Sequence, residues 1–427
     1  MRFSDDGPDV PNELIQLQRQ GDVAFVVGAG ISKRADLPLF EELTRLIYQA
    51  AMEPLPKEPL SLAGKGEIDA FQAKEWDRAL GLLERRVSFR NPQLPDSLHL
   101  TRVRQEAENL LNYKPGSKLD AHSAILNISR DGHGRPRLIT TNFDTLLERA
   151  AVQLRKEPPP SYAGQAMPPV GGPDFHGILH LHGRIEDREV NCERTELILT
   201  SGDFGEAYLR AGWASRFIYD LMRRYTLVFV GYEANDPPMR YMLEAVEAAR
   251  DRFPDLKERY AFAPLSDKSE RDIKEIWDAK GCKAIAFDDE AKSFQKLYDT
   301  LGEWSSFSLN PRDWAGSRIK HIVRVPYLEA DGGTRSDAKF LAFEVRLLQA
   351  VSDFAKDSTW IGALVDRKTI CFVTFQQLPQ LPSKLRKRLR IQVMESKLDF
   401  SIGDIIVVGT CKPAHCSVVN PSAENAS

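Results

Sequence analysis

A run of apolar residues leads directly into a glycine turn near the start of the chain. Residues 23–27 read VAFVV and are followed at once by Gly28-Ala29-Gly30 and then by Ser32. Five consecutive apolar residues are typical of a strand that is covered on both faces, as in a parallel sheet. The two glycines would let backbone amides approach a phosphate, and the Ser32 hydroxyl and the start of the next helix would add to an anion site. The pattern predicts a dinucleotide-binding strand and turn, and a plain tight turn in an α/β domain is the alternative.

Strand-like and helix-like segments alternate over most of the chain. Alternation of this kind is typical of a parallel sheet with helices on both faces, so we expect a Rossmann-like α/β domain. The expected strands are 23–27, a short strand from 137, 178–182, 196–200, 226–230, 259–263 and 283–287. The expected helices are 39–52, 145–155, 207–224, 238–250, 268–280 and 290–301.

Two stretches interrupt this alternation. Residues 54–117 contain two helical patterns bounded by prolines, 69–89 and 98–112, and no strand pattern, so we expect a helical insertion beside the sheet that caps the nucleotide cleft. Residues 157–177 are rich in proline and glycine and predict a long loop.

The length of 427 residues indicates more than one domain, since a domain usually has about 100–200 residues. We expect a nucleotide-binding domain over 1–304, a linker over 305–317, a smaller C-terminal α/β domain over 318–411 with a regulatory or partner-binding role, and a polar tail over 412–427. The linker assignment depends on its serine, asparagine, proline and glycine content. In the smaller domain the expected elements are a strand at 319–328, a helix at 336–354, two strands near 359–375, a basic helix at 382–396 and a strand near 404–410.

Composition places the chain among ordinary soluble proteins. It has 42% hydrophobic residues and a net charge of -3, and no run approaches the roughly 18 apolar residues of a membrane span. The first residues are polar and acidic, unlike a secretory signal, so we expect a cytoplasmic protein without membrane contact. A basic helical face at 384–390 is short and lacks interleaved aromatic residues, which favours a solvated or partner-docking face over nucleic-acid binding.

The cysteines indicate reduced thiols rather than a metal module. There are five, and none forms a Cys-x-x-Cys pair. Cys411, His415 and Cys416 lie close together but have no fourth ligand nearby, so we expect no metal.

Polar residues follow one of the expected strands and alternate along another. Thr141, Asn142 and Asp144 come after the strand from 137, and His180 and His182 alternate along the strand 178–182. Ligands of open α/β sheets bind at the carboxyl ends of strands, which favours a binding role. The local sequence alone also fits a strand end with a helix cap at Asp144 and a buried core histidine, and we interpret His180 as structural.

Four fragments in this order resemble the sirtuin family. They are Gly28-Ala29-Gly30-Ile31-Ser32 with Leu37-Pro38-Leu39-Phe40, then Thr140-Thr141-Asn142-Phe143-Asp144, then Leu181-His182-Gly183, and finally Val230-Gly231-Tyr232-Glu233-Ala234-Asn235-Asp236-Pro237. The last is similar to a strand end of the divergent sirtuin-like proteins of bacterial anti-phage defence. The resemblance covers roughly 20–300 and implies an NAD pocket.

The chain departs from the deacylases of that family at three places. Between His182 and the strand at 226 it has only Cys192, so the paired cysteines of the deacylase zinc module are missing. Glu41 stands where deacylases usually have arginine, and Thr141 replaces the usual glutamine. These changes disfavour acyl-lysine chemistry, whereas the divergent branch typically hydrolyses NAD.

The resemblance implies a role for each matched residue. Asn142 and His182 would be catalytic: Asn142 would hold the ribose or the attacking water, and His182 would accept a hydrogen bond or proton from a ribose hydroxyl. Asp144 would bind the nicotinamide carboxamide. Gly231 and Tyr232 would contact the ligand, whereas Asp236 fits a helix cap better. The remaining expected NAD contacts are Gly28, Ala29, Gly30, Ser32, Phe40 and Thr141.

The resemblance also implies how such an enzyme is used. An NAD hydrolase that depletes cellular NAD must be gated, which implies a homo-oligomer or a protein partner such as an ATPase-helicase or an Argonaute-like nuclease. The alternatives are a sensor that binds NAD or ADP-ribose without turnover and, less favoured, an NAD-dependent protein deacylase.

Overall fold

The computed structural model describes residues 2–314, without 5–6, 57, 59, 91–100, 156, 235, 253–254, 267, 290–292 and 312, and the backbone of two strands at 360–366 and 369–374. Contacts divide the chain into two units, Arg2–Ser305 and Ser306–Ser427. The candidate site residues all lie in the first unit.

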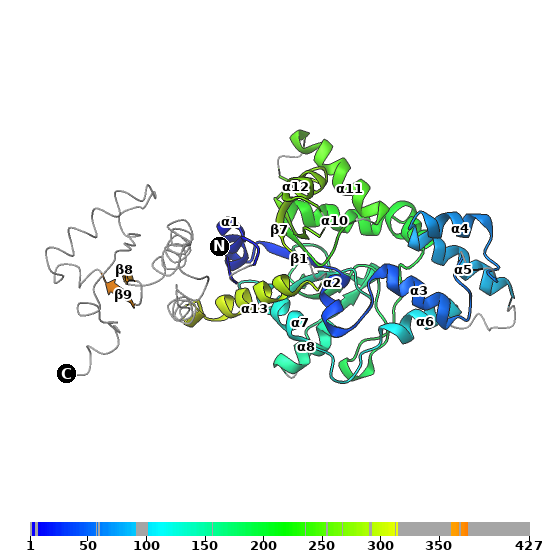
Figure 1. Cartoon of the computed structure of the whole chain (residues 1–427), viewed down its shortest axis with the longest axis horizontal. Helices are drawn as coiled ribbons and strands as arrows, with labels where there is room; N and C mark the ends of the chain where they lie inside the picture. The colour runs from blue at the N-terminus through cyan, green and yellow to red at the C-terminus, as the bar shows by residue number, and fades with distance from the viewer. Residues whose placement is uncertain are drawn as a thin grey trace, which may run out of the picture. The chain divides into compact units, whose positions relative to one another are not determined.

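The first unit is built on a seven-stranded, all-parallel sheet (Figure 1). The strand order is β3-β4-β2-β1-β5-β6-β7. Helices connect the strands, so the expectation of a Rossmann-like α/β fold is confirmed. The strands are β1 (Val23–Val27), β2 (Arg137–Thr140), β3 (Ser161–Ala163), β4 (Gly177–His180), β5 (Thr226–Val230), β6 (Arg259–Pro264) and β7 (Lys283–Phe287).

The central strand β1 is apolar because both faces of the sheet are covered there. Ala24 and Val26 of β1 belong to a buried cluster with side chains of α10, α11 and α12. Phe25 lies on the other face, where its ring contacts Trp304 of α13 edge to face. Alternate residues of β1 therefore serve two separate layers of core, which is why the whole strand is hydrophobic.

The helices agree with most of the expected ranges. Figure 1 shows α3 to α6 gathered at one end of the unit, and α4 to α6 form the helical insertion. The helices are α1 (Asn12–Gln20), α2 (Ala29–Ser32), α3 (Phe40–Ala50), α4 (Lys65–Gln72), α5 (Trp76–Arg90), α6 (Arg102–Leu111), α7 (Asp120–Ile128), α8 (Leu146–Arg155), α9 (Ser201–Phe204), α10 (Trp213–Arg224), α11 (Pro237–Ala248), α12 (Glu270–Asp278) and α13 (Gln295–Leu309), with a π-helix at Gly205–Arg210.

Some expectations about individual elements are wrong. Residues 196–200 form no strand: the amide of Ile198 bonds the carbonyl of His182 instead of a neighbouring strand. The pattern at 69–89 is two helices, because Lys74 has a φ of 60° and interrupts it. The expected loop 157–177 contains the short strand β3, and α13 continues into the expected linker at 305–317.

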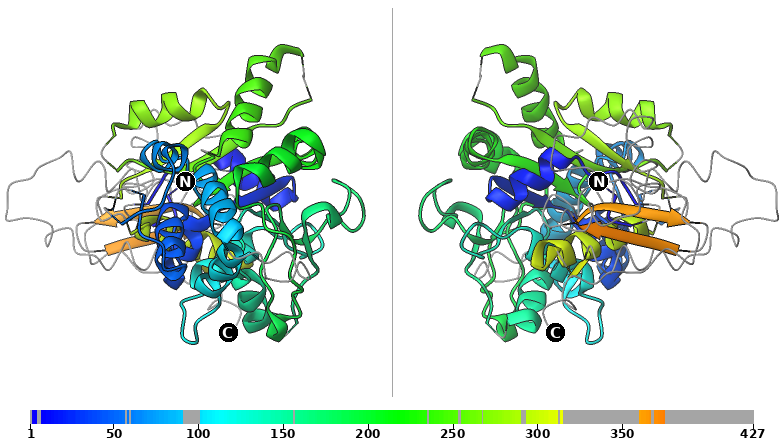
Figure 2. Two further views of the ribbon diagram at one scale, coloured as in Figure 1. Left: turned by 90° about the vertical axis from the view of Figure 1, so that its right-hand side faces the viewer. Right: turned by 90° about the vertical axis from the view of Figure 1, so that its left-hand side faces the viewer.

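The second unit is described at two strands only. β8 (Trp360–Asp366) and β9 (Thr369–Thr374), drawn in orange in Figure 2, pair antiparallel and confirm the two strands expected near 359–375. The other elements expected after 318, the basic face at 384–390 and the Cys411-His415-Cys416 group lie outside the described residues. Of the helices that the structure describes, none is long and apolar enough to cross a bilayer.

Candidate functional site

Four of the expected site residues lie at one edge of the sheet. β1 and β5 are neighbours, but the chain leaves β1 toward β2 and leaves β5 toward β6. Their carboxyl ends thus form a topological switch point, the usual ligand position in open α/β sheets. Gly28 and Gly231 follow β1 and β5 at this point, and Asn142 and His182 lie beyond the ends of β2 and β4 on the same edge.

The backbone that follows β5 packs so closely against Gly28 and Gly30 that neither position has room for a side chain. The amides of Gly28 and Gly30 donate to the carbonyls of Val230 and Gly231 at 3.0 and 2.9 Å. A Cβ atom on Gly30 would lie 2.7 Å from the Gly231 Cα, closer than packed atoms allow. On the opposite side the Tyr298 hydroxyl of α13 donates to the Gly30 carbonyl at 2.6 Å. The Gly28 and Gly30 amides are thus engaged by the backbone at the end of β5, and the approach of other backbone amides of this turn to a phosphate stays a prediction.

Ser32 is the centre of a buried polar cluster. Its hydroxyl donates to Asp144 Oδ2 at 2.9 Å and accepts from Asn142 Nδ2 at 3.0 Å. The same Nδ2 donates to the Gly28 carbonyl at 3.2 Å, and His122 Nε2 lies 3.2 Å from the hydroxyl. The cluster thus joins the turn after β1 to the end of β2 and to α7.

The proton positions in this cluster follow from the number of hydrogen-bond donors that each group has. A hydroxyl has one proton, and since Ser32 gives it to Asp144, the nitrogens of Asn142 and His122 must both donate. The other His122 nitrogen, Nδ1, is then an acceptor, and it is buried without a hydrogen-bond partner among the described residues. Burial raises the pKa of Asp144 above its usual value, and its Oδ1 caps the first amide of α8, at Leu146, as expected.

His180 is held as a structural group. It is fully buried, with Nδ1 3.0 Å from the Asn142 carbonyl and Nε2 2.8 Å from Glu148 Oε1. Burial opposes ionisation of Glu148, but the charge and hydrogen bond of His180 outweigh it and hold the pKa of that carboxyl below its usual value. This pair fixes the backbone at Asn142 and agrees with the structural interpretation of His180.

His182 lies beyond the end of β4 and has different neighbours. Its Nε2 is 2.9 Å from the Tyr208 hydroxyl, and its ring meets the Phe204 ring edge to face at 5.2 Å. Only 5% of His182 is exposed, and this burial lowers its pKa to about 3. The imidazole is therefore neutral at cellular pH.

Asn142 and His182 occupy equivalent places on adjacent strands. Thr140 of β2 pairs with His180 of β4, so each site residue lies two positions beyond a paired residue. The Asn142 side chain is directed to the turn after β1, and the His182 ring contacts the helical segment 201–210. The two residues share an edge of the sheet but have separate hydrogen-bond partners.

The other expected ligand contacts are less closely tied to this cluster. The Thr141 amide donates to the Val27 carbonyl at 3.0 Å, whereas Phe40 is half-buried at the start of α3 and Ala29 is half-buried in α2. Tyr232 donates its hydroxyl to Asp236 Oδ1. Asp236 stands at the N-cap position of α11, as expected, although its side chain makes no capping hydrogen bond there.

Three residues of the site were not found from the sequence. His122, Glu148 and Tyr208 are buried partners of Ser32, His180 and His182. Tyr208 falls in the expected helix 207–224, and nothing in a helical pattern identifies which tyrosine meets a histidine. His122 and Glu148 lie in helices whose apolar spacing gives no sign that a polar residue faces inward.

Two of the buried histidines, His122 and His182, make stability depend on pH. Burial lowers the pKa of His182 to about 3 and that of His122 to about 4, against about 6.5 in the unfolded chain. The unfolded state therefore binds protons first as the pH falls below 6.5, and the folded state loses stability. Between pH 7.5 and 5 each histidine should remove about 2 kcal/mol from the free energy of unfolding.

Urea unfolding of the wild type and of His122→Asn at the two pH values measures this effect. The loss between pH 7.5 and 5 should be smaller in the variant by about 2 kcal/mol. Equal losses in both proteins would mean that His122 titrates normally in the folded chain.

Two further findings concern metals and thiols. Within the residues that the structure describes, no group of three or more His, Cys, Asp or Glu side chains is arranged to hold a metal ion. Cys192 and Cys282 are buried free thiols.

Comparison with known proteins matches parts of the chain to a family model and to a curated relative. The model of the SIR2-like domain matches residues 136–285, which include β2, β4, β5 and both Asn142 and His182. The "Uncharacterized protein y4cA" of Sinorhizobium fredii (strain NBRC 101917 / NGR234) is 36% identical over 369 residues, which are 85% of this chain and 29% of that protein. The chain thus spans less than a third of the length of this relative.

Solved structures give weaker similarities. A Sir2 homologue in complex with NAD is 15% identical, with 72% of this chain and 98% of that chain covered and a TM-score of 0.34. A mutant Sir2 homologue in complex with 2'-O-acetyl ADP ribose is 14% identical, with 70% and 98% covered and a TM-score of 0.31.

Proposed function

We propose that this chain hydrolyses NAD to nicotinamide and ADP-ribose. The observation that carries the proposal is the placement of Asn142 and His182 at equivalent positions beyond β2 and β4, beside the switch point of the sheet. The match of residues 136–285 to the SIR2-like domain supports a ligand related to NAD.

The chemistry needs few protein groups. Nicotinamide leaves as a neutral molecule from a cationic ring, so no general acid is required, and the sugar passes through an oxocarbenium-like transition state that must be oriented and supported electrostatically. The protein has to position the ribose and one water molecule. An amide oxygen and a neutral imidazole are sufficient for that task.

Asn142 suits the orienting role because only half of its carboxamide is used within the protein. Nδ2 donates to Ser32 Oγ and to the Gly28 carbonyl, which fixes the plane of the group. In the described part of the chain no hydrogen bond engages Oδ1, so this oxygen is left to accept one from a water molecule or a ribose hydroxyl. Ser32 and Asp144 would then stabilise the orientation of Asn142, and Asp144 would bind the carboxamide of nicotinamide.

A sensor that binds NAD or ADP-ribose without turnover is the second candidate. The observation that favours it is the contact of His182 Nε2 with the Tyr208 hydroxyl, which occupies the nitrogen that a base would use. Protein deacylation is a third and weaker candidate, because Cys192 is the only cysteine between His182 and β5.

Incubation of the purified chain with NAD, with and without an acetylated peptide, separates the three. A hydrolase releases nicotinamide and ADP-ribose in both reactions, a deacylase releases nicotinamide only with the peptide, and a sensor binds NAD and releases nothing. His182→Ala should abolish release in the first case. Turnover in this variant at the wild-type rate would refute the role of His182.

In the cell we propose a gated effector of anti-phage defence that depletes NAD, acting as an oligomer or with a protein partner in the cytoplasm. A test is expression of the chain with its partner under phage challenge while cellular NAD is measured. NAD that stays constant while phage growth is suppressed would refute depletion as the mechanism.

A further inference from the structure

The ring of His182 is held by one helical segment, residues 201–210. Phe204 of α9 packs against the ring, and Tyr208 of the π-helix Gly205–Arg210 contacts Nε2 through its hydroxyl at 2.9 Å. Tyr208 is 3% exposed, so the contact is closed to solvent. π-helices are rare and are frequently found at functional sites.

The direction of this hydrogen bond determines what His182 can do. In the described part of the chain His182 is the only polar partner of the Tyr208 hydroxyl, and a buried hydroxyl proton without an acceptor is unfavourable. Tyr208 therefore donates to Nε2, and the single proton of the neutral imidazole lies on Nδ1. In this arrangement His182 has no free nitrogen that could accept a hydrogen bond or a proton from a ribose hydroxyl.

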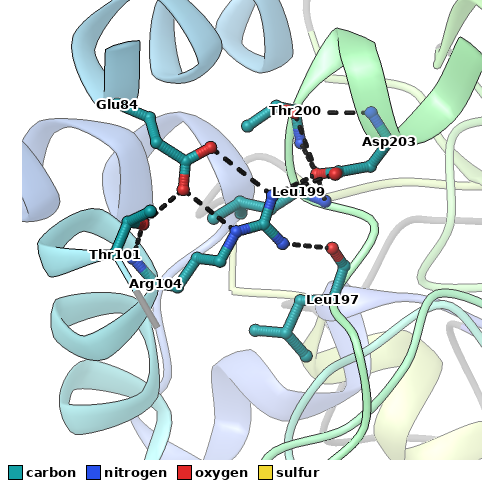
Figure 3. Close-up of polar contacts among 7 residues, drawn as sticks. All are labelled: Glu84, Thr101, Arg104, Leu197, Leu199, Thr200 and Asp203. Atoms are coloured by element: carbon teal, nitrogen blue, oxygen red, sulfur yellow. Dashed lines mark hydrogen bonds and ion pairs between the residues drawn. The ribbon is translucent and has the colours of Figure 1, made fainter. Parts of the chain in front are cut away.

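The segment that carries Tyr208 is in turn held by Arg104 of the helical insertion (Figure 3). Arg104 Nη1 donates to the Leu197 carbonyl at 2.7 Å, and Nη2 lies 2.8 Å from Asp203 Oδ2. Its Nε donates to Glu84 of α5 at 3.0 Å. The guanidinium thus joins α5 and α6 to the start of α9.

The anchored point is close to Tyr208 in the chain. Asp203 Oδ2, which accepts a hydrogen bond from Arg104, also accepts hydrogen bonds from the amides of Leu199 and Thr200. The bond from Thr200 completes the capping box of α9. Tyr208 follows Asp203 by five residues in a continuous helical segment. α5 also passes close to the N-cap of α9, since a Cβ atom added to Gly81 would lie 3.4 Å from the Thr200 Cβ.

We propose that Tyr208 caps the accepting nitrogen of His182 and that Arg104 of the helical insertion holds Tyr208 in place, so that the insertion keeps the candidate site in a resting state. Activation then requires a movement of the insertion, or of segment 201–210, that withdraws the hydroxyl from Nε2. The catalytic consequence rests on the proposed NAD hydrolysis, whereas the hydrogen bond and its anchor can be measured without it.

Two variants of the full chain test whether Tyr208 and Arg104 hold His182 in the resting state. Tyr208→Phe removes only the hydroxyl and keeps the ring that packs in the core. Arg104→Gln removes the contacts to Asp203 and Glu84. Both should raise the rate of nicotinamide release roughly 2- to 10-fold, the change in population that the loss of one net hydrogen bond supports. An increase in rate is not expected from general damage to the fold.

The chain offers a matched pair of control variants away from segment 201–210, at Tyr48 of α3 and Arg86 of α5. Tyr48 is fully buried and donates to Glu67 at 2.8 Å, and Arg86, with a side chain 14% exposed against 13% for Arg104, pairs with Glu67 and Glu53. No described contact joins this group to segment 201–210. Tyr48→Phe and Arg86→Gln should therefore leave the rate at or below that of the wild type.

The tautomer of His182 gives a readout that does not depend on activity. The chain has eight histidines, so the ¹⁵N signals of the His182 ring can be assigned by their loss in His182→Asn. The wild type should show Nδ1 protonated and Nε2 accepting, and the Nε2 signal should shift in Tyr208→Phe and in Arg104→Gln but not in the two controls.

The outcomes separate the two proposals. The proposed cap on His182 is wrong if Nε2 carries the proton in the wild type. It is also wrong if Tyr208→Phe lowers the rate, or if this variant changes neither the Nε2 signal nor the rate. A shifted Nε2 signal in Tyr208→Phe but not in a folded Arg104→Gln protein would refute the role of the insertion. If no protein releases nicotinamide, the proposed hydrolase is wrong, and the ring signals alone decide whether Tyr208 caps His182.

Discussion

Asn142→Ala should reduce the rate of nicotinamide release from NAD by at least about 100-fold, the usual effect of removing one group that supports charge in a transition state. The substitution removes both the oxygen and the nitrogen of the carboxamide. The Oδ1 acceptor proposed for the water or ribose is lost, and so are the contacts of Nδ2 with Ser32 and with the Gly28 carbonyl. The measurement is steady-state release of nicotinamide, together with thermal unfolding to show that the variant is folded.

Asn127→Ala is the matched control for this substitution. Asn127 lies on α7, is 8% exposed like Asn142, and donates through Nδ2 to Ser305 Oγ at 3.1 Å. It should lower stability without a selective loss of turnover. Equal losses of activity in the two folded variants would show that Asn142 acts only through stability, and full activity in Asn142→Ala would remove it from the mechanism.

Gly231→Ala should lower the free energy of unfolding by about 3 kcal/mol and abolish NAD binding. Gly231 has a φ of 61°, a left-handed conformation that costs a residue with a Cβ atom about 1–2 kcal/mol. The added Cβ would also lie 2.8 Å from the Ile31 amide nitrogen, and overpacking of this kind costs about 1–3 kcal/mol. Urea unfolding and calorimetric titration with NAD measure the two effects.

Gly164→Ala separates the two causes. Gly164 has a φ of 57°, but an added Cβ would meet no atom within 4 Å. This variant should lose only about 1–2 kcal/mol and retain NAD binding. If both alanine variants lose the same amount, the close approach of the turn after β1 to the end of β5 contributes nothing to stability.

Most of the sheet could be predicted because its central strands are runs of apolar residues. β1 and β5 are covered on both faces, so every residue of these strands is buried. Burial is therefore visible in the sequence as the consecutive, mostly apolar residues 23–27 and 226–230. Asn142 could be placed at this edge because it follows a parallel strand, whereas His182 was expected within the strand 178–182 and lies two residues beyond the end of β4. The roles assigned to them and to the other ligand contacts, and the domain boundaries, stay predictions.

The partners of these residues could not be predicted, because they depend on contacts between distant parts of the chain. Ser32 meets His122 and Asn142 across 90 and 110 residues. The false strand at 196–200 has the same cause. Its alternating pattern fits a strand, but Arg104 takes the Leu197 carbonyl and Asp203 takes the Leu199 amide, so its backbone groups are satisfied without a strand partner.

The π-helix before α10 has a consequence for changes in chain length. In it the Ala211 amide reaches back five residues to the Glu206 carbonyl, one residue farther than an α-helical bond spans. Deleting a single residue from the segment between Tyr208 and Ala211 would let an ordinary α-helical turn form. Since each residue of an α-helix turns by about 100°, this deletion would change the rotation of Tyr208 relative to α10 by about that angle. The phenol could not then keep its contact with the imidazole while α10 kept its packing, so the extra residue of this turn is what makes the two compatible.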